Sequence, residues 1–501
     1  MGKGLKKREI LFFLIIGVMF FVVIGKYYPL GDFVRMIEME YRTSRYREEF
    51  GSTLVAPSLQ GFAKSIPVLT YHGIVERPDG ANVILSEFKD QMLALKREGW
   101  QTISFEDFFA FMQGERHVPD KSFLLTFDDG QKLSYYPVDP ILRVLGFRAV
   151  NFVITRQSLG KGTSYYLSKR ELVDMLKSGR WEIQVHARDA HELIPIDSEG
   201  NGGHFLSNKM WLEDVHRLET SREFKDRILG EFISAKRELE DSLGVRVIGY
   251  AYPFGDFGQG TVNYPEARKI ISEAIRSVFP LYQAYQVWEG GGYIYNYPDV
   301  DKDNFLVKRI SVKPEWTAND LVGVLTAGKE KHLPYIDDLV FNRGWRGVSA
   351  RVNVYNGEFL LTPDAGSTSA MAFLDGSAFW KDYLYAVYVQ EFNGKTLSLV
   401  FRYRDNDNHA RCDYKLGSVG LTVRENGQDR MIVERKSSIS QLSNLAVGVL
   451  VKENVARCIT KNGPVMFGVL PESLATGGVG LKIWDSATGS ASLVTTGLTV
   501  E

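Results

Sequence analysis

The feature that most constrains this chain is a short apolar run that ends in two adjacent carboxylates. Phe123 to Phe127 reads as a buried strand, and Asp128, Asp129 and Gly130 follow it directly. The glycine permits the sharp turn that follows. Asp-Asp-Gly after a strand is also ordinary turn chemistry. In α/β proteins, however, catalytic groups are displayed at the carboxyl ends of strands, and two acids there can divide the work between holding a metal and moving protons.

Around this stretch, short apolar runs alternate with helical stretches from residue 66 to about residue 327. Repeated βα units predict a parallel sheet. About seven strands over such a length favour a closed or nearly closed barrel over an open sheet. Strands are expected at 68–71, 102–105, 123–127, 149–154, 181–185, 245–252, 278–285 and 305–312, and helices at 88–98, 106–112, 137–145, 221–243, 266–276 and 319–327, with a further helix opened by the capping box Ser168-x-x-Glu171.

The second chemical signal is His186-Ala-Arg-Asp-Ala-His191, directly after the strand expected at 181–185. A spacing of five does not suit one face of a helix, so the pair belongs to a strand end and the loop that follows. Two imidazoles and one carboxylate form a common shell for a catalytic divalent metal. The plain alternative is two surface histidines in a loop, although the chain has only eight histidines.

Two further motifs also fall at the carboxyl ends of expected strands. Tyr71-His72-Gly73 ends the first strand, and Tyr250-Ala-Tyr-Pro-Phe-Gly255 ends a later one. The second motif predicts a wall of a substrate groove, or simply a rigid exit from the strand. All four signals therefore lie on the face where barrel enzymes work. A polar insertion between His191 and Thr220 is expected to overhang that face as a mobile cap.

The start of the chain predicts membrane targeting. Four cations within residues 1–9 precede an apolar run over residues 10–25. The cationic flank predicts a cytoplasmic start and an exported remainder. The run is short for a spanning helix, which needs about 20 residues, so a cleaved signal peptide is the alternative. We predict a single-pass cell-membrane anchor over residues 1–30, with the catalytic part outside the cytoplasm, or secretion after cleavage.

The next segment, residues 31–65, is predicted to be a stalk or linker. Phe33, Ile37, Tyr41 and Tyr46 recur at helical spacing and indicate a docking helix over 32–50. A solvated linker fits the same residues.

After residue 333 the helical periodicity disappears, and alternating runs predict an all-β sandwich of the jelly-roll type over 334–501. Asn-Gly at 393–394, 426–427 and 462–463, and Gly-Gly at 477–478, are hairpin signals. Trp380, Tyr383, Tyr388 and Trp484 are candidates for stacking on sugar rings, but such aromatics more often fill a sandwich core.

Composition limits the remaining possibilities. A net charge of −1 supplies no field that would attract nucleic acid, so we predict no nucleic-acid partner. Two cysteines, Cys412 and Cys458, are too few for a Cys-rich zinc module. They form one disulfide in an oxidising compartment, or remain as two buried thiols. The oligomeric state stays open.

Taken together, the motifs resemble a known family. Thr126-Phe-Asp-Asp-Gly130, His186 with His191, and Tyr252-Pro-Phe-Gly255 are similar to the successive motifs of the polysaccharide deacetylases, the NodB-homology carbohydrate esterases of family 4. The histidine spacing and Val68-Leu-Thr-Tyr-His-Gly73 more closely resemble the branch that deacetylates poly-β-1,6-N-acetylglucosamine. The resemblance covers about residues 66–315. It implies a distorted (β/α) barrel, here over residues 66–333.

The resemblance also implies site roles. Asp128 corresponds to the general base, and Asp129, His186 and His191 correspond to the ligands of a divalent metal, Zn²⁺ first, with Co²⁺ or Ni²⁺ as alternatives. The substrate would be an acetylated polysaccharide, contacted through Tyr252, Pro253 and His72. We further expect the backbone N–H of Tyr252 to stabilise the oxyanion.

Two features depart from the family pattern. The late Leu-x-His motif that supplies a general acid is missing, since His332 matches poorly, and His72 is an alternative acid. The family's arginine beside the base has no clear counterpart either, because Arg246 lies too early on its strand, while Arg309 at the end of another strand is a substitute.

The leading hypothesis is a metal-dependent hydrolase that removes acetyl groups from an N-acetylhexosamine polymer. A noncatalytic glycan-binding or envelope scaffold protein is the alternative from a different class. A third possibility is deacetylation of another polymer, such as peptidoglycan or xylan, by the same chemistry.

Overall fold

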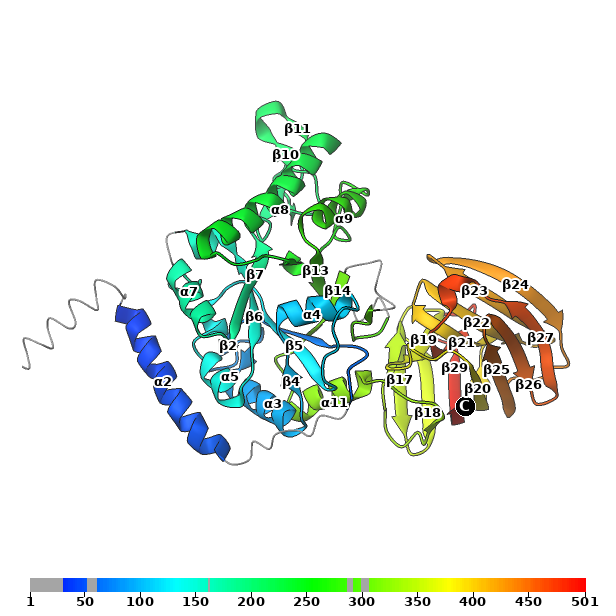
Figure 1. The fold of residues 1–501 in the computed structure, drawn as a ribbon. Helices are drawn as coiled ribbons and strands as arrows, with labels where there is room; N and C mark the ends of the chain where they lie inside the picture. Colours follow the sequence, from blue (N-terminus) through cyan, green and yellow to red (C-terminus); the bar gives the residue numbers. More distant parts are fainter. Residues whose placement is uncertain (1–29, 52–60, 161–162, 286–291, 299–305) are drawn as a thin grey trace, which may run out of the picture.

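The computed structural model describes residues 30–51, 61–160, 163–285, 292–298 and 306–501. Seven parallel strands close into a barrel, which Figure 1 places beside a β-sandwich. Each strand pairs with the next one along the chain, and the last returns to the first. They are β1 (Val68–Tyr71), β5 (Ser122–Phe127), β6 (Ala149–Ile154), β7 (Trp181–Ala187), β12 (Gly249–Ala251), β13 (Leu281–Tyr285) and β14 (Leu306–Ser311).

The central strands are buried on both faces, as a sheet covered by helices requires. Every residue of β5 and of β6 is buried. The helices that accompany the barrel are α3 (Leu85–Arg97), α4 (Phe105–Met112), α5 (Asp139–Leu145), α6 (Thr155–Leu159), α7 (Lys169–Lys177), α8 (Ser221–Leu243), α9 (Ala267–Val278) and α11 (Ala318–Gly328). The capping box predicted at Ser168 and Glu171 opens α7.

Two expected strands are shorter than predicted because some of their residues form hydrogen bonds with side chains instead of with a neighbouring strand. Only Gln101–Thr102 forms a strand, β4, since Ser104 caps α4 by accepting from the N–H of Asp107. The strand expected at 245–252 is reduced to β12 because the N–H groups of Ile248 and Gly249 donate to the side chain of Gln184 instead.

The insertion after β7 stands above the barrel beside α8 and α9 (Figure 1). It consists of two small hairpins, β8 (Leu193–Pro195) with β9 (Gly202–His204), and β10 (Trp211–Leu212) with β11 (Arg217–Leu218). Arg227 of α8 donates to the carbonyls of Phe205 and Asn208 and pairs with Glu219. The predicted cap is therefore hydrogen-bonded to a long helix. A small pair of strands, β2 (Ile74–Val75) and β3 (Val83–Ile84), follows β1.

The segment predicted as a stalk is a helix, α2 (Leu30–Phe50), which packs on the barrel. The predicted contact face is wrong at two of its positions. Ile37 and Tyr41 are exposed, whereas Tyr46 and Phe50 join the core of the barrel. Ion pairs hold the exposed side of α2 to the barrel, including the pair between Glu49 of α2 and Lys89 of α3. These pairs satisfy the charged face while the aromatic end of the helix is buried.

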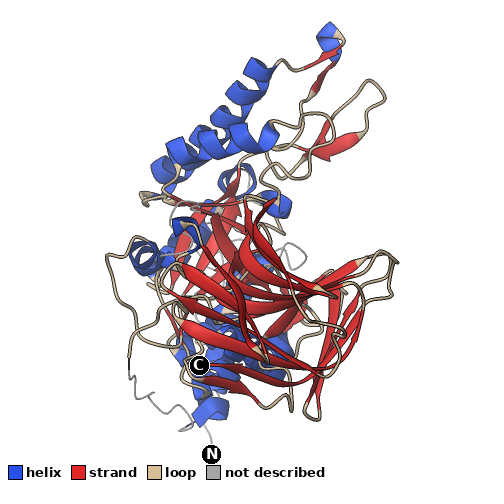
Figure 2. Cartoon of the chain, turned by 90° about the vertical axis from the view of Figure 1, so that its right-hand side faces the viewer, coloured by secondary structure: helices blue, strands red, loops and turns tan. Residues whose placement is uncertain are grey.

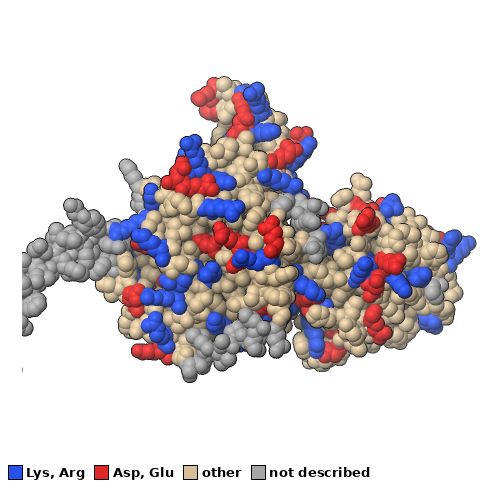
Figure 3. Space-filling model, in the orientation of Figure 1, with Lys and Arg blue, Asp and Glu red and all other residues tan. Residues whose placement is uncertain are grey.

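No helix among the described residues combines the length and the apolarity needed to span a bilayer. The anchor predicted over residues 1–30 lies outside the described residues, apart from Leu30. Figure 3 shows both signs of charge interspersed over the face drawn, in keeping with the small net charge.

Residues beyond α11 form two antiparallel sheets packed face to face. In Figure 2 these sheets lie in front of the barrel. One sheet contains β17 (Ala350–Tyr355), β18 (Glu358–Pro363), β29 (Ser492–Val500), β20 (Tyr383–Asn393), β25 (Leu445–Lys452), β26 (Val455–Thr460) and β27 (Gly463–Val469), with β15 (Tyr335–Asp337) beside β29. The other contains β16 (Trp345–Val348), β19 (Ser369–Leu374), β28 (Gly478–Trp484), β21 (Thr396–Asp405), β22 (Asn408–Lys415), β23 (Ser418–Glu425) and β24 (Gln428–Lys436).

Only two of the four predicted turns are hairpins. Asn426–Gly427 joins β23 to β24, and Asn462–Gly463 joins β26 to β27. Asn393–Gly394 instead carries the chain from one sheet to the other, and Gly477–Gly478 opens β28 after a loop. A turn dipeptide permits a reversal of direction but does not determine whether the next strand pairs with the previous one.

The barrel and the sandwich share an apolar core. Tyr293, which follows β13, packs against Phe373 and Tyr403 of the sandwich. Its hydroxyl donates to the carbonyl of Tyr403 and accepts from the N–H of Gly478. Lys331, after α11, donates from Nζ to the carbonyl of Asp375. The two parts are thus joined by buried contacts at separate positions.

Inside the sandwich, Cys412 of β22 and Cys458 of β26 form a disulfide, which links the two sheets across a sequence separation of 46 residues. Cross-links of this kind stabilise a fold mainly by restricting the unfolded chain. We expect the double variant Cys412→Ser/Cys458→Ser to lose about 2–4 kcal/mol of unfolding free energy, measured by urea denaturation. Reductant should destabilise the natural chain and leave the double variant unchanged. Equal stability of both chains would show that the cross-link contributes nothing.

Candidate functional site

Asp128, the first acid after β5, forms an ion pair with Arg309 of β14. Nη1 and Nη2 of Arg309 each donate to one oxygen of the Asp128 carboxylate at 2.8 Å, and both side chains are fully buried. Desolvation would raise the pKa of Asp128, but the guanidinium outweighs it and holds that pKa below its usual value. The arginine expected beside the base is therefore Arg309, the substitute named from the sequence.

Asp129, His186 and His191 meet at the same end of the barrel. Their ligand atoms all lie within 4.8 Å of one another. Oδ1 of Asp129 lies 3.3 Å from Nε2 of each histidine. Burial alone would raise the pKa of Asp129, but the two imidazoles hold it well below its usual range. The three residues singled out as ligands are thus brought together from two separate segments.

The orientation of His186 leaves one ring nitrogen free to coordinate. Its Nδ1 lies 2.9 Å from the carbonyl oxygen of Ala251 on β12. A carbonyl can only accept, so Nδ1 carries the proton and Nε2 keeps its lone pair toward Asp129. Metal-ligating histidines are commonly held in this way by a bond from the other nitrogen.

The loop between the two histidines is held by a buried acid that the sequence analysis missed. Glu231 of α8 accepts from the backbone N–H groups of Arg188, Asp189 and Ala190. Burial raises the pKa of Glu231, and the three N–H donors oppose that rise. The signal was present in the sequence, because Glu231 occupies a core position of α8 between Ile228 and Phe232. An acid at such a position needs buried partners.

The donor set fits a divalent metal. Oδ1 of Asp129 is buried and accepts no hydrogen bond among the described residues, although two imidazole nitrogens point toward it. Two neutral imidazoles and one carboxylate leave further coordination positions open to water and substrate, as in catalytic zinc sites.

The motif after β12 is arranged differently from the prediction. The ring of Tyr252 is buried, and its backbone N–H donates to the carbonyl of Gln283 at 3.3 Å. Pro253 is buried as well. Both side chains are thus buried. Because the N–H of Tyr252 is already bonded to Gln283, the oxyanion role predicted for it is not supported by this geometry. The exposed member of the motif is Phe254, which adopts a left-handed backbone conformation with φ of 58°.

Phe254 forms an aromatic stack beside the metal-ligand cluster. Its ring centroid lies 4.8 Å from that of His191 and 4.6 Å from that of His204, which comes from the insertion. His204 Nδ1 donates to Asp256 at 2.6 Å, and this bond holds the imidazole parallel to the phenyl ring. The insertion thus contributes one side of the site.

His72 lies at the end of β1, between the strands that carry the ion pair of Asp128. It is half-buried, and its positive charge would lower the pKa of both Asp128 and Asp129. Because Tyr71 is the register partner of Phe127, His72 lies at the same strand end as the two carboxylates, the end that the sequence motif predicts.

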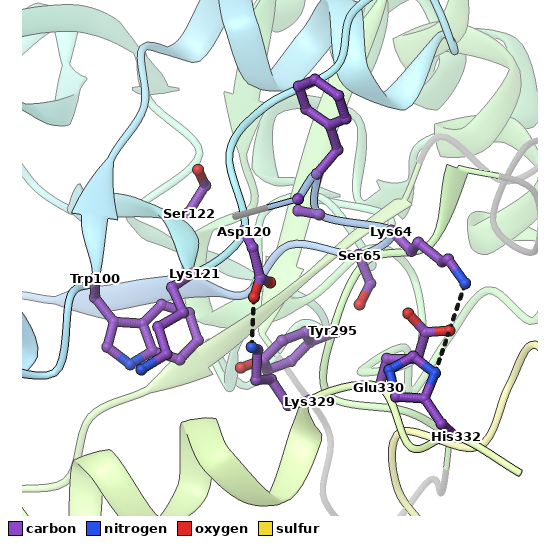
Figure 4. A pocket seen from close by; sticks show the side chains of 13 residues that line it. Lys64, Ser65, Trp100, Asp120, Lys121, Ser122, Tyr295, Lys329, Glu330 and His332 are labelled. Atoms are coloured by element: carbon purple, nitrogen blue, oxygen red, sulfur yellow. Dashed lines mark hydrogen bonds and ion pairs between the residues drawn. The ribbon is translucent and has the colours of Figure 1, made fainter. Parts of the chain in front are cut away.

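His332, by contrast, lies at the opposite end of the barrel. It lines a pocket together with Ser122, the first residue of β5, whereas Asp128 follows the last residue of that strand. Figure 4 shows that ion pairs occupy this pocket, Asp120 with Lys329 and Lys64 with Glu330. His332 is excluded as the general acid by its position.

The closed parallel barrel thus carries a buried Asp–Arg pair and a cluster of three possible metal ligands at the carboxyl ends of its strands. Residues 115–269 match the family model described as polysaccharide deacetylase, and the chain thus contains a polysaccharide deacetylase domain. This confirms the resemblance seen in the motifs.

Curated relatives and a solved structure are also similar to this chain. The chain is 24% identical over 187 residues to the poly-β-1,6-N-acetyl-D-glucosamine N-deacetylase of Escherichia coli K12, covering 35% of this chain and 28% of the relative. It is 30% identical over 115 residues to the enzyme of the same name from Staphylococcus aureus MSSA476, covering 22% and 39%. The chain therefore spans less than half the length of either. The de-N-acetylase from Aggregatibacter actinomycetemcomitans superposes with a TM-score of 0.43 at 17% identity, covering 52% of this chain and 99% of that one.

The contacts of Glu231 predict that it positions the ligand loop. Replacing it with alanine leaves three N–H groups without their acceptor, so we expect affinity for Zn²⁺ to fall roughly 10- to 100-fold, measured by competition with a chromogenic chelator. Glu231→Gln keeps one acceptor oxygen and should recover part of the loss. The exposed Glu273→Gln on α9 is the matched control. Unchanged affinity in Glu231→Ala would remove the positioning role.

Proposed function

We propose that the chain hydrolyses N-acetyl groups of an N-acetylhexosamine polysaccharide of the poly-β-1,6-N-acetylglucosamine type and releases acetate. The observation that carries the proposal is the convergence of Asp129, His186 and His191 beside the buried Asp128–Arg309 pair, within a polysaccharide deacetylase domain. The names of the curated relatives support the choice of polymer.

The proposed ligands are Asp129, His186 and His191. A divalent ion held there, Zn²⁺ first with Co²⁺ or Ni²⁺ as alternatives, would lower the pKa of a water molecule and polarise the acetyl carbonyl. Asp128 is the proposed general base. Arg309 keeps it ionised and fixes its plane, and each carboxylate oxygen retains a second lone pair with which to take the proton of the attacking water.

His72 is the proposed general acid. Breakdown of the tetrahedral intermediate releases an amine, which is a poor leaving group unless its nitrogen is protonated. His72 is half-buried and follows Tyr71, whose register partner is Phe127, so it lies at the strand end that carries both carboxylates and can donate a proton there. Export to the outer face of the cell membrane, through the anchor predicted over residues 1–30, would place this chemistry where such polymers occur.

The primary test is acetate release from acetylated β-1,6-linked glucosamine oligomers, with and without a chelator. We expect the natural chain to release acetate and the chelator to abolish it. Asp128→Asn should keep its bound metal but lose at least about 10²-fold in rate, the usual contribution of a general base. Metal content, measured by elemental analysis, separates the two effects.

Each contrary result has a distinct meaning. Bound metal with no acetate from any acetylated oligomer would favour a noncatalytic glycan-binding protein. Release from peptidoglycan or xylan fragments alone would keep the reaction and change the polymer. Normal activity of Asp128→Asn would show that Asp128 is not the base.

The role of His72 is tested by changing the leaving group. His72→Asn should slow acetate release from the amide substrate by roughly 10²-fold or more, because the amine needs a proton. The same variant should hydrolyse an activated phenyl acetate at nearly the natural rate, since a phenolate leaves without one. His204→Asn is the matched control at the other side of the site. Equal losses on both substrates would contradict an acid role for His72.

A further inference from the structure

The sheet that contains β19, β21, β22 and β28 carries a polar groove on its outer face. The groove has a volume of about 500 Å³. It lies on a sandwich, far along the chain from the residues of the proposed reaction. The groove is lined by Ser369, Thr396, Ser398, Arg411, Asp413, Lys415, Thr422, Asp429, Met431, Lys482 and Trp484.

Most of its charged groups are held rigidly by one another. Arg411 donates to Asp413 through Nε at 3.0 Å and to Asp429 through both terminal nitrogens at 3.0 and 2.9 Å. The hydroxyls of Ser398 and Thr422 also donate to Asp413. The two carboxylates are therefore satisfied within the protein, and the floor of the groove is preorganised.

Lys482 is the exception. It projects from β28, and its ammonium forms no hydrogen bond or ion pair within the described part of the chain. It is nonetheless partly buried, and desolvation lowers its pKa. A cation that is removed from water without a partner costs free energy. That cost is recovered if a ligand supplies an acceptor to the ammonium.

An aromatic side chain lies next to it on the same strand face. Trp484 is two residues from Lys482 on β28, so both side chains point to the same side of the sheet. Trp484 is 40% exposed, and its strand neighbours are Ser369 and Thr396. Lys395 Nζ lies over the Trp484 ring, 6.0 Å from its centroid, so a sugar would stack on the indole face that Lys395 leaves open. An indole face beside hydroxyls and an unpaired cation is the combination that binds the face and the hydroxyls of a sugar ring.

We propose that this groove binds the sugar polymer, in its neutral acetylated form, as a second site separate from the reaction centre. The inference rests on the proposed function only for the choice of a sugar polymer as the occupant. Three cations line the groove. Arg411 pairs with Asp413 and Asp429, and Lys415 pairs with Glu434, whereas Lys482 has no acid partner within the described part of the chain. An acetylated residue is neutral and presents a carbonyl to the ammonium, whereas the deacetylated product carries an ammonium that Lys482 repels.

The location links the groove to the barrel. Met371, the register neighbour of Lys482 on β19, belongs to the apolar core that the barrel and the sandwich share. Phe373, two residues further on the same face, packs against Tyr293 of the barrel. A polymer held in the groove therefore lies on the sheet face that is turned to the barrel.

The test uses the full chain carrying Asp128→Asn, so that the ligand is not consumed. Fully acetylated and fully deacetylated β-1,6-linked glucosamine oligomers are the probes. Hydrogen–deuterium exchange should show protection of β28 and β22 by the acetylated oligomer and little protection by the deacetylated one. Calorimetry should show that Lys482→Ala weakens binding at the groove by roughly tenfold or more, the worth of a charged hydrogen bond, and that Trp484→Ala does so as well.

Lys452→Ala is the matched control, because Lys452 is an exposed lysine on β25 of the opposite sheet. Absence of protection at β28, equal affinity for the two oligomers, or equal effects of Lys482→Ala and Lys452→Ala would overturn the proposal. The proposal would also be overturned if the groove bound polyphosphate but neither of the two sugar oligomers. Protection of β28 in Asp128→Asn, together with no acetate release by the natural chain, would refute the proposed reaction and leave the groove intact. Acetate release by the natural chain, without protection of β28 in Asp128→Asn, would support the proposed reaction and refute the groove.

Discussion

The buried pair of Asp128 and Arg309 is the interaction on which the architecture of the site depends. The two residues belong to β5 and β14, the strands on either side of β1, where the barrel closes. Two fully buried charges stabilise one another only while both are present, and removal of either costs about 3–5 kcal/mol. The same two hydrogen bonds hold Asp128 in one plane beside the metal-ligand cluster. Barrel closure and placement of the proposed base are thus a single structural feature.

Much of this arrangement was predictable from the sequence, because parallel strands display their following residues at one end of a barrel. Once the runs ending at Phe127 and Val185 are identified as strands of one parallel barrel, Asp129 and His186 are expected at the same end of it, and His191 follows in the adjoining loop. The boundaries of β1, β6 and α8 were predicted to the residue, since each has clear apolar periodicity and a clear terminator.

Other features depend on tertiary contacts that no local pattern encodes. Glu231 lies 41 to 43 residues along the chain from the loop that it holds, and only the docking of α8 on β7 reveals its partners. The helix α2 presents Tyr46 and Phe50 to the barrel rather than Ile37, because salt bridges on its flank compete with its apolar periodicity. The N–H of Tyr252 is taken by a neighbouring strand, and a motif does not report that bond.

The shared core between barrel and sandwich has a mechanical consequence. Tyr293 bonds to two different strands of the sandwich, and Lys331 joins the two parts at a separate position. Two attachments on different elements prevent the swivelling that a single flexible tether would allow. If the groove holds a long polymer as proposed, the distance between the groove and Asp128 is fixed by these attachments. That fixed distance would determine which acetyl groups along the polymer can reach Asp128.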